Sequence, residues 1–180
     1  PITVIMPKRD CIPSAVTGGL DSVGIRCPEN AIARSLIAAA GVPIAAPSAN
    51  ISGKPSPTSA LHVKGDLDGK VDMIIDGGEV GIGLESTIVD LTVEPPQILR
   101  PGYITQEMLN EVLGAVDVDK TILDNSSGQA PKAPGMKYRH YAPKTKCLLI
   151  RGNREEQIYK IQQKLQTVNA CVLGFKEDKE

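Results

Sequence analysis

Residues 45–50 (AAPSAN) place a hydroxyl and an amide directly after a short apolar run. Residues 42–46 have the length and composition of a buried strand, and open α/β sheets bind ligands beyond the carboxyl ends of their strands. Ser48, Asn50 and the backbone N–H groups of this turn could therefore surround phosphate oxygens. The same letters also fit an ordinary Asx or Ser turn, which is the stronger interpretation from spacing alone.

Ser22 and Arg26 form a second candidate pair. Residues 21–27 alternate between polar and apolar side chains, which predicts a half-buried strand with Ser22, Gly24 and Arg26 on its polar face. Four residues of strand separate the serine from the arginine by about 13 Å. One extended small molecule could touch both, because the glycine leaves room between them. A solvated polar face is an interpretation of equal weight.

Two further segments carry candidate ligand groups. The glycine-rich residues 81–83 lead into an expected strand over residues 86–91 and not into a helix, so the dinucleotide-binding fingerprint is not met. Glu85 or Ser86 at the start of that strand is still a candidate ligand. Arg100, at the end of a short expected strand, is a candidate anion ligand, although a lone arginine more often forms a surface ion pair.

Residues 137–141 (KYRHY) combine basic and aromatic side chains, a composition suited to stacking on a base or contacting a phosphate. A solvated basic linker explains them as well. The two histidines, His62 and His140, fall on an expected helix and in this linker, so covalent catalysis has no support and no catalytic residue is assigned. The four cysteines form no Cys-x-x-Cys pair, so we expect no metal site made by the protein.

Short strands and helices must position these groups. The core has no Trp and only one Phe to draw on, so it consists of Ile, Val, Leu and Ala, which suits a parallel or mixed sheet covered by helices. We expect strands over residues 1–6, 21–27, 42–46, 71–75, 86–91, 97–99, 147–150 and 170–175, and helices over residues 28–41, 58–64, 105–114 and 153–165.

Composition and charge exclude several classes of protein. The 180 residues carry a formal charge of −1 and are 41% hydrophobic, which excludes an intrinsically disordered chain. Residues 1–130 hold 9 basic and 16 acidic side chains (net −7), whereas residues 131–180 hold 11 and 5 (net +6). The acidic part is unsuited to broad nucleic-acid binding. Scattered thiols favour a reduced, cytoplasmic compartment, and prolines interrupt the longest uncharged run, so we expect no membrane contact.

Seven segments are distinctive when they are read together. They are residues 1–5 (PITVI), 16–26 (VTGGLDSVGIR), 45–57 (AAPSANISGKPSP), 76–78 (DGG), 83–90 (GLESTIVD), 98–102 (ILRPG) and 134–143 (PGMKYRHYAP). In this order they resemble the threonylcarbamoyl-AMP synthase family (YrdC-type), in its longer form with two domains and a linker. Each segment alone is weakly specific, and the specificity comes from their order between Pro1 and Lys144.

The resemblance implies an α/β fold with a twisted, open, mixed sheet and flanking helices. Residues 1–114 would be the C-terminal part of the catalytic domain, residues 115–146 the interdomain linker, and residues 147–180 the truncated start of a Rossmann-like second domain. Members of the family carry further upstream elements, including a Lys-x-Arg segment that contacts ATP. We therefore expect an internal fragment that is inactive or very weakly active alone.

The resemblance also implies a nucleotidyltransferase activity. Members convert L-threonine, bicarbonate and ATP into threonylcarbamoyl-AMP and pyrophosphate, the first step toward N6-threonylcarbamoyladenosine at position 37 of tRNA. The residues implied for threonine are Arg26, Ala46 and Ser86, and those implied for ATP are Ser22, Ala46, Ser48, Asn50, Ser56, Arg100 and Ala133. Mg²⁺ would accompany ATP, and the downstream tRNA threonylcarbamoyl transferase machinery would be the protein partner.

Two alternatives stay open at this point. One is a non-catalytic module that binds double-stranded RNA or a nucleotide, which salt-dependent RNA contact through residues 131–146 would support. The other is a carbamoyltransfer domain of the same fold, as in hydrogenase maturation proteins. The sequence of residues 136–143 (MKYRHYAP) favours the synthase over that second alternative.

Overall fold

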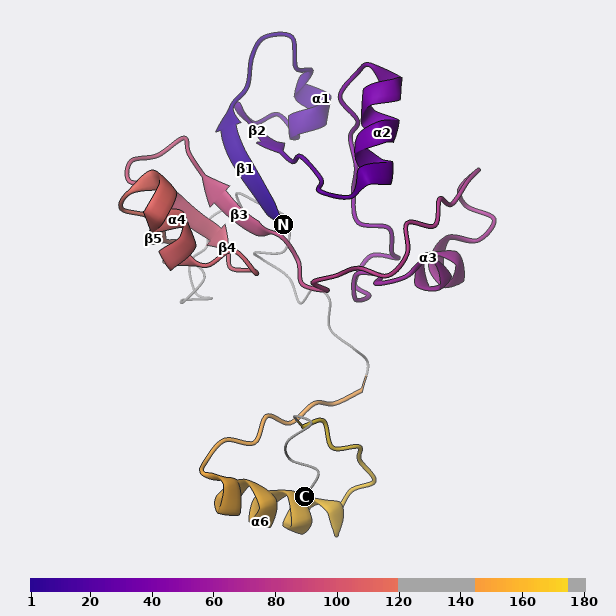
Figure 1. Cartoon of the computed structure of the whole chain (residues 1–180), viewed down its shortest axis with the longest axis vertical. Coiled ribbons are helices and arrows are strands. Elements are labelled where there is room, and N and C mark those ends of the chain that lie inside the picture. The colour runs from indigo at the N-terminus through magenta and orange to yellow at the C-terminus, as the bar shows by residue number, and fades with distance from the viewer. Residues whose placement is uncertain (120–144, 175–180) are drawn as a thin grey trace. The chain divides into compact units, whose positions relative to one another are not determined.

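The computed structural model describes residues 1–119 and 145–174 (Figure 1). The chain divides into two compact units, Pro1–Ala142 and Pro143–Glu180, and each is described here by itself. The first unit holds a sheet, and the second holds one long helix with the segments on either side of it.

A mixed five-stranded sheet is the centre of the first unit. Its strands are β1 (Ile2–Pro7), β2 (Ser22–Ile25), β3 (Thr87–Asp90), β4 (Gln97–Arg100) and β5 (Asp117–Val118), in the order β2-β1-β3-β4-β5. The β1–β3 and β4–β5 pairs are parallel, and the β1–β2 and β3–β4 pairs are antiparallel. The sheet and its accompanying helices confirm the mixed α/β fold predicted from the sequence.

The core lies on the two faces of β3 and β4. On one face Val89 and Ile98 pack with Leu109 of α4 (Gln106–Leu113) and with Val116. On the other face Ile88 and Leu99 pack together with Ile5 of β1 beside them. As predicted, aliphatic side chains alone form the buried apolar clusters of the described residues.

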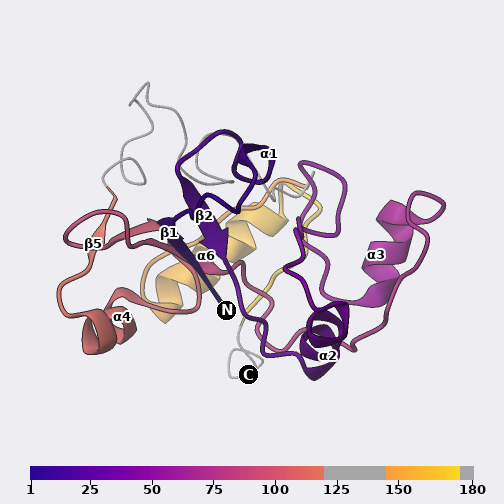
Figure 2. The same cartoon turned by 90° about the horizontal axis from the view of Figure 1, so that it is seen from above.

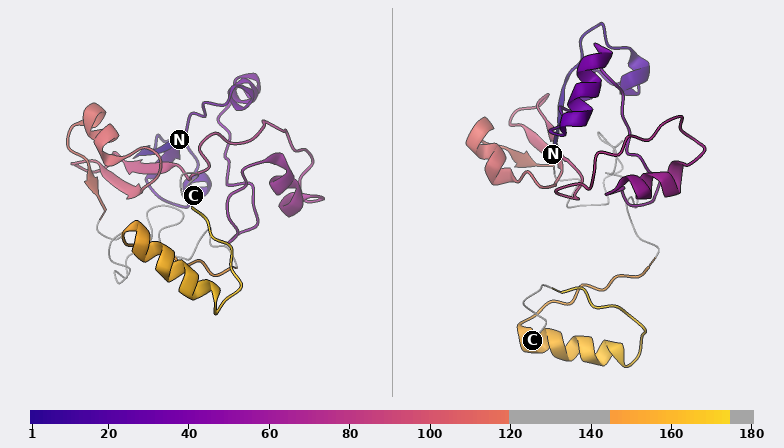
Figure 3. Two further views of the ribbon diagram at one scale, coloured as in Figure 1. Left: turned by 60° about the horizontal axis from the view of Figure 1, so that its bottom comes forward. Right: turned by 45° about the vertical axis from the view of Figure 1, so that its right-hand side comes forward.

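Helix boundaries follow their capping residues. In α2 (Ala31–Ala40), Asn30 accepts a hydrogen bond from the backbone N–H of Ala33, and Gly41 ends the helix in the left-handed conformation. The remaining helices are α1 (Ser14–Thr17), α3 (Ala60–Leu67) and, in the second unit, α6 (Arg154–Leu165). Figures 2 and 3 show α2 and α3 to one side of the sheet, away from α4.

Two strands expected in the first unit are absent. Residues 42–46 and 71–75 form no strand, and most of their side chains are exposed, including Val42 and Met73. An apolar run becomes a strand only when a neighbouring strand takes its backbone hydrogen bonds, and no strand of residues 1–119 pairs with either run. The expected buried strand before Ser48 is therefore wrong.

Smaller differences concern helix starts and the second unit. Helix α3 begins at Ala60, two residues after the expected start at residue 58, and α2 begins at Ala31, three residues after the expected start at residue 28. Residues 147–150 and 170–174 are not strands, although the helix expected over residues 153–165 is present as α6. The short β5 and the buried Val116 lie where composition suggested linker from residue 115 onward. No helix of the described residues is long and apolar enough to cross a membrane.

Candidate functional site

Strand pairing brings three separated candidate residues to one end of the sheet. Ile2 pairs with Thr87, Val4 with Ile25, and Ile88 with Arg100. The starts of β1 and β3 therefore lie beside the ends of β2 and β4. Arg26 directly follows β2, Ser86 directly precedes β3, and Arg100 ends β4. A hydroxyl and two guanidinium groups thus lie at the same end of the strands, which we call the sheet end.

Arg26 is attached to the first strand. Its Nε donates a hydrogen bond of 2.8 Å to Oγ1 of Thr3, whose side chain is buried. Arg26 itself is exposed. An arginine anchored at Nε and exposed to solvent has the chemistry of a carboxylate or phosphate receptor.

Ser86 and Arg100 are in direct contact. The carbonyl oxygen of Ser86 accepts hydrogen bonds from Nε of Arg100 at 3.0 Å and from Nη2 at 2.8 Å. Ser86 is buried, and Arg100 is half-buried. The guanidinium therefore ties the start of β3 to the end of β4, and any ligand of Arg100 would lie close to Ser86.

The turn after Arg100 requires glycine. A Cβ added at Gly102 would lie 2.5 Å from the carbonyl oxygen of Glu85 and 2.7 Å from the backbone nitrogen of Thr87. Real Cβ atoms do not approach backbone this closely, so only glycine lets the chain cross the start of β3. The residues 98–102 (ILRPG) thus form a strand end pressed against the segment that carries Ser86.

Ser22 lies at the opposite end of β2 from Arg26. It pairs with Pro7 and is half-buried. Between the two, a Cβ added at Gly24 would lie 3.4 Å from side-chain atoms of Ile5 and Thr3. The strand is shorter than the expected residues 21–27, and the side chains of Ile5 and Thr3 occupy the space over Gly24 that was expected to be open. A common ligand for Ser22 and Arg26 stays a prediction.

The loop over residues 46–57 carries four of the candidate residues. Ala46 and Ser48 are exposed, and Asn50 and Ser56 are half-buried. The side-chain amide of Asn50 donates to the carbonyl oxygens of Ile51 and Lys54, both at 3.0 Å. Its Oδ1 is buried and has no hydrogen-bond partner among the described residues. Asn50 therefore holds its own turn through its amide nitrogen and not as the expected Asx turn, in which Oδ1 would accept a backbone N–H.

Asp66 of α3 holds the same loop and was missed by sequence reasoning. Its Oδ2 accepts a 3.1 Å hydrogen bond from the backbone N–H of Ile51, and its Oδ1 pairs with Nζ of Lys54. The hydrogen bond from Lys54, followed by that from Ile51, lowers the pKa of Asp66 below its usual range. No local pattern could reveal this contact, because the carboxylate and its partners are joined only by the tertiary fold.

Comparison with known proteins assigns the chain to a family. A family model described as "Telomere recombination", which covers Sua5, YciO and YrdC proteins, matches residues 1–102. The chain belongs to this Sua5–YciO–YrdC family. A second family model, for the threonylcarbamoyl-AMP synthase C-terminal domain, matches residues 104–180.

Individual relatives support the assignment of this chain to the Sua5–YciO–YrdC family. Threonylcarbamoyl-AMP synthase of Pyrococcus abyssi is 47% identical over 178 residues, which cover 99% of this chain and 50% of the relative. The enzyme of Bacillus subtilis is 47% identical over 163 residues, covering 90% and 46%. A crystal structure of P. abyssi Sua5 complexed with L-threonine superposes with a TM-score of 0.84 at 48% identity, covering 92% of this chain and 48% of that one. The chain thus spans about half the length of the curated relatives it matches.

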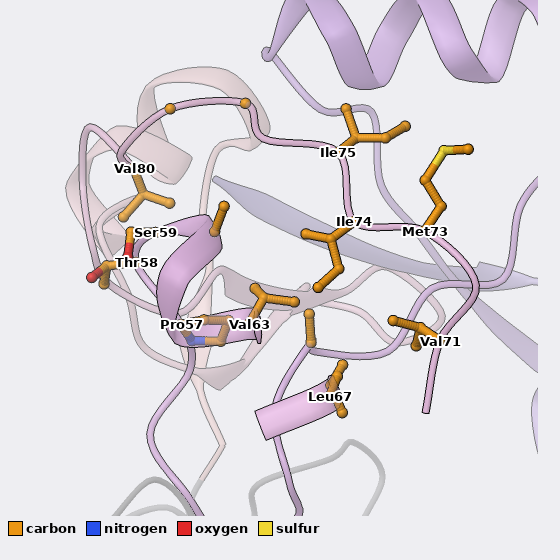
Figure 4. A pocket seen from close by; sticks show the side chains of 14 residues that line it. Pro57, Thr58, Ser59, Val63, Leu67, Val71, Met73, Ile74, Ile75 and Val80 are labelled. Atoms are coloured by element: carbon orange, nitrogen blue, oxygen red, sulfur yellow. The ribbon is translucent and has the colours of Figure 1, made fainter. Parts of the chain in front are cut away.

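An apolar pocket of about 380 Å³ lies between α3 and residues 71–80, and Ala49 and Pro57 of the loop over residues 46–57 also line it. Val63 and Leu67 of α3 face Ile74 and Val71 across it (Figure 4). No charged side chain lines the pocket, so it offers nothing to neutralise a phosphate or a carboxylate. The backbone of this region is held by a 3.1 Å hydrogen bond from Val80 N–H to the carbonyl oxygen of Thr58.

The remaining sequence-based candidates of this family member divide into two groups. Ala133 and residues 137–141, including His140, lie outside the described residues. His62 is described: its Nδ1 lies 3.2 Å from Oγ1 of Thr58 at the start of α3, a local helix-end contact. Within residues 1–119 and 145–174, no group of three or more His, Cys, Asp or Glu side chains could hold a metal ion.

Proposed function

We propose that this chain is part of an L-threonylcarbamoyladenylate synthase, a nucleotidyltransferase, and carries residues of its substrate site. The reaction converts L-threonine, bicarbonate and ATP into threonylcarbamoyl-AMP, pyrophosphate and water. The observation that carries the proposal is the 47% identity to a threonylcarbamoyl-AMP synthase over 99% of the chain. The P. abyssi structure with L-threonine supports the amino acid as a ligand of this fold.

The sheet end carries charged and polar groups that could bind the carboxylate and hydroxyl of an amino acid. The carboxylate of L-threonine would pair with the exposed guanidinium of Arg26, and Ser86 and the backbone at Ala46 would contact the rest of the molecule. Holding the carboxylate directs the amino group away from the arginine. That nitrogen attacks bicarbonate carbon with loss of water, and the carbamate oxygen then attacks the α-phosphorus of ATP as pyrophosphate leaves.

The nucleotide would occupy the region between the sheet end and the loop over residues 46–57. Arg100 and the loop residues Ser48, Asn50 and Ser56 provide donors for phosphate and ribose oxygens, with further contacts assigned to Ser22 and Ala133. No nucleophilic side chain is needed, because the protein's work is to place two anionic reactants in line and to stabilise the charge that develops. The contact of Arg100 with the Ser86 carbonyl would place the two substrates side by side.

Mg²⁺ would enter with ATP and not through a protein cage. The candidate residues are serines, an asparagine and arginines, and the described residues contain no cluster of acidic metal ligands. Mg²⁺ commonly keeps several waters and binds substrate phosphates. It would neutralise triphosphate charge, while Arg100 and the loop hold the phosphates in place.

The product determines the class of partner. A threonylcarbamoyl adenylate is a mixed anhydride, so it must be consumed by a transferase that passes the acyl group to a nucleophile. We assign that step to the tRNA threonylcarbamoyl transferase machinery, with N6 of adenosine 37 in tRNA as the acceptor.

Binding of L-threonine to the full chain tests the proposal. Isothermal titration should show L-threonine binding that Arg26→Ala reduces at least about tenfold, since the variant loses a charge-assisted hydrogen bond. Arg34→Ala, which removes an exposed arginine from α2, is the matched control and should bind as the wild type does. Pyrophosphate release with ATP and bicarbonate is measured alongside. Absence of binding, or equal binding by Arg26→Ala, would contradict the proposal.

A further inference from the structure

A buried threonine contacts the arginine to which the substrate carboxylate is assigned. Thr3 of β1 is only 8% exposed, and its Oγ1 accepts the 2.8 Å hydrogen bond from Nε of Arg26. The two residues are distant in sequence. The antiparallel register that pairs Val4 with Ile25 makes them neighbours on adjacent strands.

The surroundings of Thr3 hold its hydroxyl in place. A Cβ added at Gly24 would lie 3.4 Å from Cγ2 of Thr3, so the threonine methyl packs closely over the glycine backbone. On the other side β1 pairs with β3 through Thr3 and Ile88, and Ile88 is buried in the core. Reorienting the threonine would open this packing. Its hydroxyl is therefore a fixed acceptor and not a mobile surface group.

An arginine that binds a carboxylate gains from such an acceptor. Arg26 lies beyond the end of β2 and is exposed, so without this hydrogen bond its long side chain would have more rotamers to lose on binding. The Nε–H bond lies in the plane of the guanidinium, and a hydrogen bond at Nε therefore fixes the orientation of that plane. A carboxylate that accepts two parallel N–H bonds depends on this orientation.

We propose that Thr3 is a positioning residue for Arg26, whose hydroxyl fixes the guanidinium plane in which the carboxylate of L-threonine is bound. This role rests on the proposed function, because that function supplies the carboxylate. Thr3 acts through Arg26 and has no contact with the substrate itself.

The first test measures the hydrogen bond directly. Thr3→Val removes the acceptor and preserves the shape of the side chain. In the ¹⁵N-labelled full chain, the Arg26 Nε–H signal, assigned by its loss in Arg26→Lys, should exchange with water about tenfold faster in Thr3→Val than in the wild type. Thr3→Ser retains the hydroxyl and should restore slow exchange.

The second test measures the consequence for binding. The dissociation constant for L-threonine should rise about tenfold in Thr3→Val and stay close to the wild-type value in Thr3→Ser. Thr92→Val is the matched control, because it removes a threonine hydroxyl that donates to Asp90 at the opposite end of β3. Titrations are made well below the melting temperature of each variant. Thr3→Ala, which also lacks the acceptor, replaces Thr3→Val if the valine variant does not fold.

Each outcome separates the positioning role from the proposed function. Unchanged Nε–H exchange in Thr3→Val, or binding of L-threonine equal to that of the wild type, overturns the role of Thr3. A purely structural role predicts a lower melting temperature with an unaltered dissociation constant, which also overturns it. If the wild-type chain does not bind L-threonine, that result contradicts the proposed function and also overturns the role of Thr3 in threonine binding.

Discussion

Single side chains hold the sheet end and the neighbouring loop together through bonds to the backbone. Arg100 binds the carbonyl oxygen of Ser86, Asn50 bridges its own turn, and Asp66 holds Ile51. In each case a polar side chain satisfies a backbone group that no helix or sheet ladder reaches. The residue types were visible in the sequence, but their partners are set by the fold.

Asp66 should make the loop over residues 46–57 sensitive to acid. Its pKa is lowered in the folded state, first by the hydrogen bond from Lys54 and then by that from Ile51. A group of this kind stabilises the fold above its unfolded-state pKa and loses that contribution as the pH falls through the lower, folded-state value. The protection factor of the Ile51 amide should therefore be high at neutral pH and fall once the pH drops below the ordinary aspartate range.

Hydrogen exchange measured by NMR checks this prediction. Asp66→Asn should lower the protection factor of the Ile51 amide at neutral pH and remove its dependence on acid. Asp72→Asn, on the exposed stretch after α3, is the matched control and should behave as the wild type does. An acid-insensitive Ile51 amide in the wild type would refute the assigned role of Asp66.

At the scale of elements, helix ends were predicted better than strands. Gly41 ends α2, and Thr105 and Gly114 bound α4, as predicted, because a cap acts on backbone groups within one turn. The start of α2 was predicted three residues too early, at residue 28. The prediction of strands at the apolar runs 42–46 and 71–75 was wrong. A strand depends on a partner that local composition does not contain.

The helix α6 should depend strongly on its N-cap. None of its residues, all of which the structure describes, is buried, and Oδ1 of Asn153 accepts a 2.9 Å hydrogen bond from the Glu156 N–H. Asn153→Ala should therefore destabilise the helix by about 1 kcal/mol, seen as faster hydrogen exchange of the amides in its second turn. Gln163→Ala, an exposed change within the helix, is the control. Equal exchange in Asn153→Ala and the wild type would show that the cap contributes nothing.

At the scale of the whole molecule, the first unit exposes many large apolar side chains between residues 42 and 84. Leu61 is 79% exposed, Met73 76%, and Val42 and Leu84 61% each. Soluble monomers seldom leave so much apolar surface uncovered, and such surface commonly marks a region that another segment or protein covers. The same unit buries its aliphatic core well on both faces of β3 and β4.

This apolar surface should bind a hydrophobic dye. The full chain is expected to enhance 8-anilinonaphthalene-1-sulfonate fluorescence under native conditions, and the double variant Leu61→Gln with Met73→Gln should reduce the enhancement without lowering the melting temperature. Val112→Gln is the control, since Val112 is 81% exposed on α4, outside the segment between residues 42 and 84. A wild-type chain that leaves the dye fluorescence unchanged would be inconsistent with these exposures.

The amino-acid sequence by itself determined the mixed α/β class, the capped helices and the residue types available for binding anions. These features depend on interactions within a few residues, or on composition, and so they can be read locally. Only the tertiary structure decided that Arg26 donates a hydrogen bond to Thr3 and that Arg100 donates to the carbonyl oxygen of Ser86. It also decided that Asp66 accepts a hydrogen bond from Ile51 in the loop of Asn50. Such contacts require strand registers and a loop closure between distant parts of the chain, which no local pattern encodes.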